Sequence, residues 1–379
     1  MKKLLFVMQS LTLGGTERQL VWLANRLVAK GYDVTILLWL DVFDLRSELD
    51  PRVHVIYKST KEHLGDRVPY IRHKFYDESM WSVRATPRRF YRYYVGHKKY
   101  DVEIAFFHTW AVKIVGGSAN KKAKRLAWVH HMYDAHDWIA SKETALYRQL
   151  YAKCDKVVCV SNIAKKGFIN TFGDTGNLIT IYNMLPVSDI INKAASAPPV
   201  PLPEAKLRVV LVARLNNKIK GQLRLINAVS KLRAEGADIS LTLVGRGEDE
   251  EMIRSAVSER NAENYIAMAG STPNPYPYIR SADLLVCASS NEGYNLTVAE
   301  AMILGTPVLS TDCSGPREIL DGGKYGMLVE NSEEGLFQGL RRLYNDPALL
   351  EEYRKKAAHR VDFFNEDTIL KQITDLIEE

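Results

Sequence analysis

The 379-residue sequence has only four cysteines, and no two of them form a CxxC pair. This excludes a zinc site or a dithiol redox motif with the usual ligand spacing. We expect buried thiols in a reducing compartment; the four are Cys154, Cys159, Cys287 and Cys313.

Long hydrophobic runs are also missing. No apolar stretch approaches the roughly 18 residues of a transmembrane helix. The N-terminus has two lysines and then only five apolar residues, Leu4 to Met8, without a small-residue cleavage site, so it does not resemble a signal peptide. We therefore expect a cytoplasmic protein that touches a membrane only from its surface.

Two ligand-binding motifs are absent. Because the G-x-G-x-x-G motif is absent, the hypothesis that the protein binds a nicotinamide dinucleotide loses its main support. No DxD motif occurs, and the acidic residues Glu248 to Glu251 stand where they open a helix and complement its dipole. We therefore expect no metal and no other cofactor.

The composition is that of a globular protein, with 46% hydrophobic and 25% charged residues. The length suits two domains. The net charge of +6 is divided unevenly, since residues 1–185 carry +12 and residues 186–379 carry −6. The first half is therefore expected to meet an anionic partner, either nucleic acid or an acidic membrane.

Strand-like and helix-like segments alternate twice along the chain. Thr16 to Lys30 has helical spacing, and Thr16 with Gln19 fits a capping box. Four prolines between Pro198 and Pro203 mark a linker. The pattern predicts an α/β fold of two doubly wound, Rossmann-like domains facing across a cleft. The expected parts are domain 1–188, linker 189–206, domain 207–360, and a C-terminal helix within 361–379 that returns to the first domain. The expected strands are 3–9, 33–39, 53–57, 102–107, 125–130, 156–160, 178–182, 207–213, 239–244, 265–269, 284–288 and 307–310.

The strongest motif is SSNEGYNLTVAEAMILGTPVLS (289–310), in which Glu292 and Glu300 are separated by seven residues. Residues 295–304 are expected to form a helix, so free N–H groups between Gly293 and Thr297 can cradle a phosphate. Glu292 is placed to bind sugar hydroxyls and Glu300 to bind ribose. The alternative is a buried helix with two capping or surface glutamates.

This run resembles glycosyltransferase family four, whose members carry an E-x7-E motif followed by EAM, a glycine and PV. GGTE (14–17), ARLNNKIKGQ (213–222), LVGRGEDEEM (243–252), NPYPYIRSAD (274–283) and SGPREIL (314–320) follow the family's order, so the resemblance covers nearly the whole chain. It implies the GT-B fold and a retaining sugar transfer from a nucleotide-diphosphate sugar, with UDP favoured over GDP.

The resemblance also implies roles for residues outside that motif. Arg214 and Lys220 would neutralise the donor diphosphate, as two fixed cations can. His130, after a strand in the first domain, would contact the donor sugar or orient the reaction centre. The catalytic set implied is His130, Arg214, Lys220 and Glu292, and the donor-binding set is Gly14, Gly15, Arg214, Lys220, Glu292, Gly293, Asn295, Leu296, Thr297 and Glu300.

Residues 58–100 mix cations with aromatics, which suits an anionic bilayer, single-stranded nucleic acid or a solvated helix face. In the family this segment belongs to the acceptor-binding domain. We therefore expect a glycan or lipid-linked acceptor, an anionic membrane surface and no nucleic-acid partner. The rival classes are a nucleotide-sugar epimerase or hydrolase of GT-B shape, a non-catalytic nucleotide-binding protein, and a basic nucleic-acid-binding protein.

Overall fold

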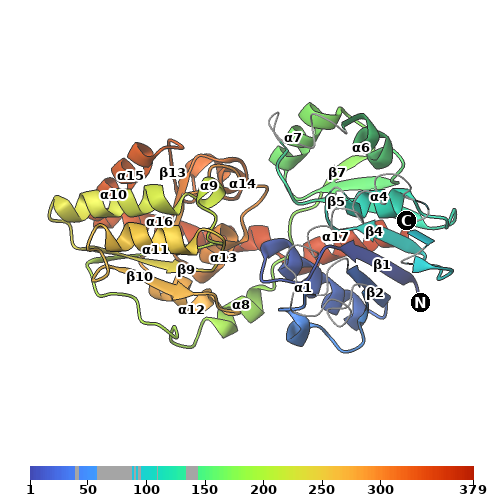
Figure 1. Ribbon diagram of the computed structural model, residues 1–379, viewed down its shortest axis with the longest axis horizontal. Helices are drawn as coiled ribbons and strands as arrows, with labels where there is room; N and C mark the ends of the chain where they lie inside the picture. The colour runs from blue at the N-terminus through green and yellow to red at the C-terminus, as the bar shows by residue number, and fades with distance from the viewer. Residues whose placement is uncertain (39–41, 58–87, 89–90, 93–94, 109, 134–143) are drawn as a thin grey trace, which may run out of the picture. The chain divides into compact units, whose positions relative to one another are not determined.

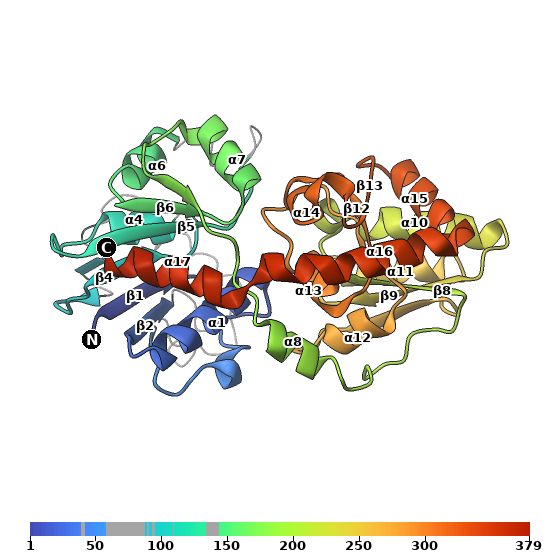
Figure 2. The ribbon, with the colours of Figure 1, turned by 180° about the vertical axis from the view of Figure 1, so that it is seen from behind.

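The computed structural model describes residues 1–38, 42–57, 88, 91–92, 95–108, 110–133 and 144–379. The chain forms two compact units, one of Met1–Met184 with Thr368–Glu379 and the other of Leu185–Asp367 (Figures 1 and 2). The polypeptide therefore crosses between the units twice, near residues 184 and 367.

The first unit is built on a seven-stranded parallel sheet with the order β3-β2-β1-β4-β5-β6-β7. Its central strands are apolar runs buried on both faces, as parallel sheets covered by helices require. The register pairs Leu4 of β1 with Val34 of β2 and Val102 of β4. The strands are β1 (Lys3–Met8), β2 (Asp33–Leu38), β3 (His54–Tyr57), β4 (Val102–Ala105), β5 (Lys124–Val129), β6 (Lys156–Cys159) and β7 (Leu178–Thr180).

Helix α1 (Gly15–Ala29) follows β1, and the capping box expected at its start is wrong. Its N-cap is Gly14, which makes no side-chain cap hydrogen bond. Thr16 lies inside the helix, so its hydroxyl is past the N-cap position. Among the described residues up to 184, the other helices are η1 (Arg46–Glu48), α4 (Trp110–Gly116), α6 (Thr144–Tyr151) and α7 (Asn162–Phe172).

The last helix, α17 (Glu366–Glu378), packs on the first unit. Its apolar face is buried, and first-unit lysines satisfy carbonyls of its last turn, which has no intrahelical donors. Lys2 Nζ donates to the carbonyl of Ile377 at 2.8 Å, and Lys124 Nζ donates to that of Leu376 at 2.6 Å. The C-terminal helix therefore completes the fold of the N-terminal unit.

The second unit has a six-stranded parallel sheet with the order β10-β9-β8-β11-β12-β13. Its strands are β8 (Leu207–Val212), β9 (Ile239–Val244), β10 (Ile266–Gly270), β11 (Leu284–Cys287), β12 (Val308–Thr311) and β13 (Met327–Val329). Its helices are α8 (Val187–Lys193), α9 (Asn217–Lys220), α10 (Gln222–Ala234), α11 (Glu250–Ser258), α12 (Tyr276–Ser281), α13 (Leu296–Leu304), α14 (Ser314–Ile319), η3 (Asp321–Gly323), α15 (Glu333–Asn345), α16 (Pro347–Arg360) and η4 (Val361–Phe364).

The doubly wound α/β architecture is confirmed in each unit, and their arrangement across a cleft stays a prediction. The linker expected at 189–206 is wrong at its beginning, because α8 continues to Lys193; residues 194–206, which hold the four prolines, form no helix or strand. Strand β13 was not expected, since three residues are too few to show a period. Among the described residues, no helix has the length and apolar character needed to cross a membrane.

Candidate active site

The second unit brings two loops together at the carboxyl ends of its central strands. Strands β8 and β11 are neighbours, so the segments that follow them meet at one sheet edge. Gly221 ends α9 and has a positive φ of 66°. A Cβ atom added to Gly221 would lie 2.2 Å from the carbonyl oxygen of Ala288. The amide of Ser290 donates to the carbonyl of Ile219 at 2.8 Å. A glycine is therefore needed for the two loops to approach this closely.

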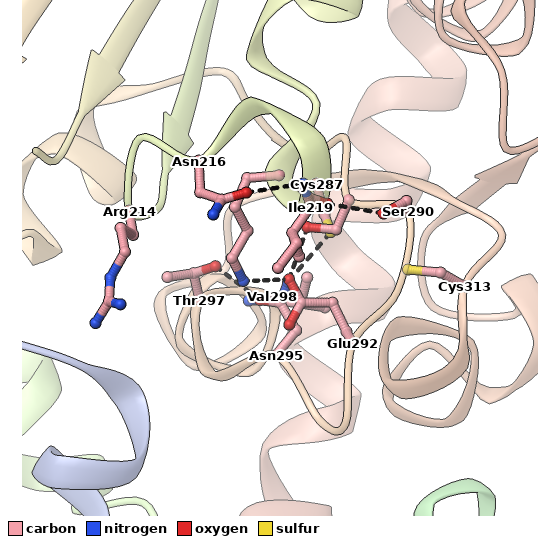
Figure 3. A network of polar contacts seen from close by, with 12 residues as sticks. Arg214, Asn216, Ile219, Cys287, Ser290, Glu292, Asn295, Thr297, Val298 and Cys313 are labelled. Carbon is pink, nitrogen blue, oxygen red and sulfur yellow. Dashed lines mark hydrogen bonds and ion pairs between the residues drawn. The ribbon is translucent and has the colours of Figure 1, made fainter. Parts of the chain in front are cut away.

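Lys220 and Glu292 form an ion pair between these loops. Glu292 is labelled in the polar network of Figure 3. Lys220 Nζ lies 2.6 Å from Glu292 Oε1, and the two side chains are 26% and 11% exposed. Burial opposes the lysine's charge, but the charge of Glu292 and its hydrogen bond outweigh burial and hold the pKa of Lys220 above its usual value. The ammonium group is therefore charged at neutral pH.

The same carboxylate oxygen accepts two further hydrogen bonds. Ser289 Oγ donates to Glu292 Oε1 at 2.6 Å, and Asn295 Nδ2 donates to it at 3.1 Å. Three donors thus fix the position of one oxygen atom. Ser289 was missed in the sequence, where nothing distinguishes it from an ordinary loop serine.

Asn295 connects this carboxylate to the start of α13. Its backbone is left-handed, with φ of 79°, which is unusual for a residue with a side chain. Its Oδ1 accepts from the amide of Val298 at 3.1 Å and from the hydroxyl of Thr297 at 2.8 Å. Asn295 is therefore the N-cap of the helix, and not its first residue as expected.

The N-terminus of α13 can meet an anion. Because the cap accounts for the amide of Val298, helix geometry leaves the N–H groups of Leu296 and Thr297 without an intrahelical acceptor. Such groups, together with the helix dipole, favour a phosphate. Gly293 precedes the cap, and Glu300, inside α13, is only 3% exposed.

Arg214 lies at the end of β8, in the segment that leads to α9. Its side chain is exposed and lies apart from Glu292 and Asn295 in Figure 3. Its carbonyl accepts from Gln222 Nε2 at 2.9 Å, so the backbone of Arg214 is fixed while the guanidinium extends into solvent. The structure therefore brings Lys220, Glu292 and Asn295 into contact and leaves Arg214 beside them.

In the first unit, Gly14 and Gly15 lie between β1 and α1. Gly14 is extended, with φ of −132°. A Cβ atom there would lie 2.2 Å from the carboxylate of Glu17, whose side chain bonds to the Thr12 hydroxyl at 3.2 Å. The small residue thus lets the carboxylate of Glu17 fold back over the loop.

His130 follows β5 and is half-buried against Phe106, with ring centroids 4.6 Å apart. Its Nε2 is buried, and no group in the described part of the chain hydrogen-bonds to it. Burial lowers the pKa of His130 to about 3, so the imidazole is neutral at pH 7. His108, after β4, also has its pKa lowered to about 3. His108 was missed in the sequence, although its position after a predicted strand, like that of His130, could have indicated it.

The cysteines are free and buried, as expected. Within the described part of the chain, no three His, Cys, Asp or Glu side chains are grouped so that they could hold a metal ion. Much of the basic and aromatic segment 58–100 falls outside the described residues, including Arg89. Within it, Arg88, Arg92, Lys98 and Lys99 are described and exposed.

Sequence comparisons match both halves of the chain to transferases. The model of Glycosyltransferase Family 4 matches residues 13–188, and that of Glycosyl transferases group 1 matches residues 206–346. An uncharacterized glycosyltransferase of Haemophilus influenzae is 25% identical over 98% of this chain and 99% of its own length. N-acetylgalactosamine-N,N'-diacetylbacillosaminyl-diphospho-undecaprenol 4-alpha-N-acetylgalactosaminyltransferase of Campylobacter jejuni is 27% identical over 63% of this chain. That match spans 64% of the Campylobacter protein.

Solved structures share the fold over the full length. HepE from Anabaena, crystallised with UDP and glucose, has a TM-score of 0.77, with 19% identity and complete coverage of both chains. TarM from S. aureus, crystallised with UDP, Fondaparinux and alpha-GlcNAc-glycerol, also has a TM-score of 0.77, with 14% identity and complete coverage of both chains. The fold is therefore GT-B.

Proposed function

The chain belongs to the glycosyltransferases of family four, and from this premise we propose that it moves a sugar from UDP to a glycan or lipid-linked acceptor with retention at the anomeric carbon. UDP is favoured over GDP because HepE and TarM were crystallised with UDP. The Campylobacter relative is named for transfer to a lipid-linked saccharide, which supports an acceptor of this class.

The contact between Lys220 and Glu292 at the N-terminus of α13 carries this proposal. A leaving diphosphate needs positive charge and N–H donors that are already in place. Lys220 and Arg214 supply the charge, and the amides of Leu296 and Thr297 supply donors. Glu292, held by Ser289 and Asn295, then binds hydroxyls of the transferred sugar.

Three groups complete the donor site in this proposal. Glu300 binds the ribose, His130 contacts the donor sugar, and the loop of Gly14 and Gly15 lets the backbone approach the donor closely. In the reaction, the bond from the anomeric carbon to the diphosphate breaks as the acceptor oxygen bonds to that carbon from the same side. The acceptor's proton passes to a donor phosphate oxygen, and UDP leaves. No enzyme carboxylate forms a covalent bond.

Ligand binding and product analysis test this function. A thermal-shift panel compares UDP, GDP and their sugar conjugates, since a ligand at 100 times its Kd stabilises the fold by about 2.7 kcal/mol. We expect stabilisation by UDP and UDP-sugars. Donor that is only hydrolysed or epimerised in the presence of lipid-linked and glycan acceptors would contradict transfer and favour an epimerase or hydrolase of the same shape.

Chelation is expected to leave the activity intact. Two fixed cations and helix N–H groups supply the electrostatic stabilisation that a metal gives in other transferases. Turnover in excess EDTA should equal turnover in magnesium, measured as UDP release. Complete loss of turnover on chelation, restored by manganese or magnesium, would show that the fixed groups are insufficient.

The first unit is proposed to dock on an anionic cytoplasmic leaflet. Residues 1–185 carry a net charge of +12, and Arg88, Arg92, Lys98 and Lys99 are exposed. Each basic residue near such a surface contributes about 1 kcal/mol. Screening over about 8–10 Å at physiological ionic strength makes the attraction depend on salt.

We therefore expect binding to acidic liposomes at low salt, release at high salt, and weak binding to neutral liposomes. Cosedimentation measures the partition. Replacing Arg88, Arg89, Arg92, Lys98 and Lys99 by Gln should weaken binding without changing UDP affinity. Five exposed second-unit cations replaced by Gln provide a charge-matched control: Lys218, Arg254, Lys324, Arg341 and Lys355. If the wild-type protein ignores acidic liposomes at low salt, a soluble acceptor is the better hypothesis.

A further inference from the structure

The carboxyl ends of β4 and β5 present three histidines in the first unit. The two strands are parallel neighbours, and Ala105 is the register partner of Ala127. His108 and His130 each follow their alanine by three residues, so they leave the sheet at the same level. His131 comes next, and its ring stacks on that of His108, with centroids 5.3 Å apart and planes at 24°.

Aromatic rings enclose these imidazoles. The ring of Phe107 stacks on His108 with centroids 4.2 Å apart. Tyr133 presents its ring edge-on to His108 and His131, at centroid distances of 6.4 and 5.4 Å. These rings form one packed cluster at the sheet edge where ligands of parallel α/β domains bind; Tyr133 is buried, and Phe107, His108 and His131 are partly exposed.

The imidazoles of His108 and His130 are kept uncharged at neutral pH. Burial, and then electrostatic repulsion from protonated His131 and His130, lower the pKa of His108 to about 3. His108 Nδ1 and His130 Nε2 are buried and have no hydrogen-bond partner among the described residues. A buried polar atom left unpaired costs about 1–3 kcal/mol, which a ligand hydroxyl would recover. Rotation of an imidazole about its Cβ–Cγ bond exchanges Nδ1 with Cδ2 while the ring plane stays in place, so the nitrogen of a half-buried ring can turn toward a ligand.

The neutral imidazole of His108 and the flat rings around it match one class of ligand. A phosphate or carboxylate requires a cation or a set of N–H donors, and a neutral imidazole has one N–H donor at most. A sugar ring has hydroxyls that both donate and accept, and an apolar C–H face that packs on aromatic rings. The chemistry of the cluster therefore favours an uncharged saccharide.

We propose that His108, with His131, binds the terminal sugar ring of the acceptor, and that this ring carries no charge. The inference rests on the proposed transferase activity and specifies its acceptor. His108 holds the sugar ring through a hydrogen bond. The rings of His131 and Tyr133 pack against the imidazole of His108 and fix its position.

The test uses the full chain saturated with UDP. Saturation-transfer NMR measures binding of the methyl glycosides of glucose, galactose and N-acetylgalactosamine, with methyl glucuronide and inorganic phosphate as charged probes. We expect at least one neutral glycoside to bind through its ring protons and both charged probes to bind more weakly.

His108→Phe keeps a flat ring but removes both nitrogens, and should weaken glycoside binding about three- to tenfold, the loss of one hydrogen bond. His108→Asn retains polar atoms near the position of Nδ1 and should weaken it less. His97→Phe, at an exposed histidine ahead of β4, is the matched control. UDP affinity, measured by calorimetry, should stay unchanged in all three variants.

Equal glycoside binding by His108→Phe and wild type would overturn the assignment of His108. Tighter binding of methyl glucuronide or phosphate than of every neutral glycoside would overturn the uncharged acceptor. Failure of the proposed function is separate, because it would appear as an absence of UDP and UDP-sugar binding in the wild-type protein.

Discussion

Lys220→Met is expected to lower turnover by about a hundredfold or more, because a fixed charge at the leaving group is worth that much in catalysis. Methionine keeps the length of the side chain and removes the ammonium that lies 2.6 Å from Glu292. Glu292 retains the hydrogen bonds from Ser289 and Asn295, so the fold should survive. UDP release from the donor sugar measures the effect, and the melting temperature reports on the fold.

Lys218→Met is the matched control, since Lys218 lies in the same short helix and its side chain is exposed. A double variant separates two roles of Lys220. If Lys220 served only to hold Glu292, then Lys220→Met with Glu292→Gln would be no slower than Glu292→Gln alone. If Lys220 stabilises the diphosphate, the double variant should be slower still. A single variant as active as wild type would remove Lys220 from the site.

Asn295→Asp is expected to fold normally and to lose about a hundredfold in turnover, as misplacement of a reacting group can. Aspartate caps helices as well as asparagine, and its charge suits the helix N-terminus. However, it replaces the amide donor 3.1 Å from Glu292 Oε1 with a second carboxylate oxygen. Two carboxylates this close raise the pKa of the pair.

The pH dependence identifies the cause. As pH falls through the raised pKa of the pair, the shared proton restores a hydrogen bond to Glu292, so turnover relative to wild type should rise. Asn295→Gly provides the contrast, because it relieves the left-handed backbone but removes both the cap and the donor, and no proton can replace them. If Asn295→Asp and wild type have parallel pH profiles, Asn295 does not position Glu292.

The strands other than β13 were predictable because they are apolar runs bounded by turn residues. The prediction was less accurate at the start of α1, where Thr16 with Gln19 matched a capping box and Gly14 is the N-cap. A capping motif acts only at the residue where the helix begins. Local sequence defines that residue only to within one or two positions.

The residues of the candidate site were likewise predicted only in part. Glu292, Lys220 and Asn295 stand out in the sequence because a family motif contains them. Ser289 lies in the same run but was not singled out, and His108 lies outside the motifs; the contacts of both depend on what lies beside them in space. Lys220 and Glu292 are 72 residues apart, and they meet because β8 and β11 are adjacent in the sheet.

The sequence by itself determined that the chain forms α/β units, that its two halves differ in charge, and which motif lies at the start of α13. These features follow from local sequence, because hydrophobic periodicity and local hydrogen bonding involve residues only a few positions apart. Only the tertiary structure decided that Lys2 and Lys124 hold the last turn of α17, that three donors fix one oxygen of Glu292, and that His108 lies beside His131. Those contacts join residues far apart in the chain, and their geometry follows from strand order and packing, which local sequence does not specify.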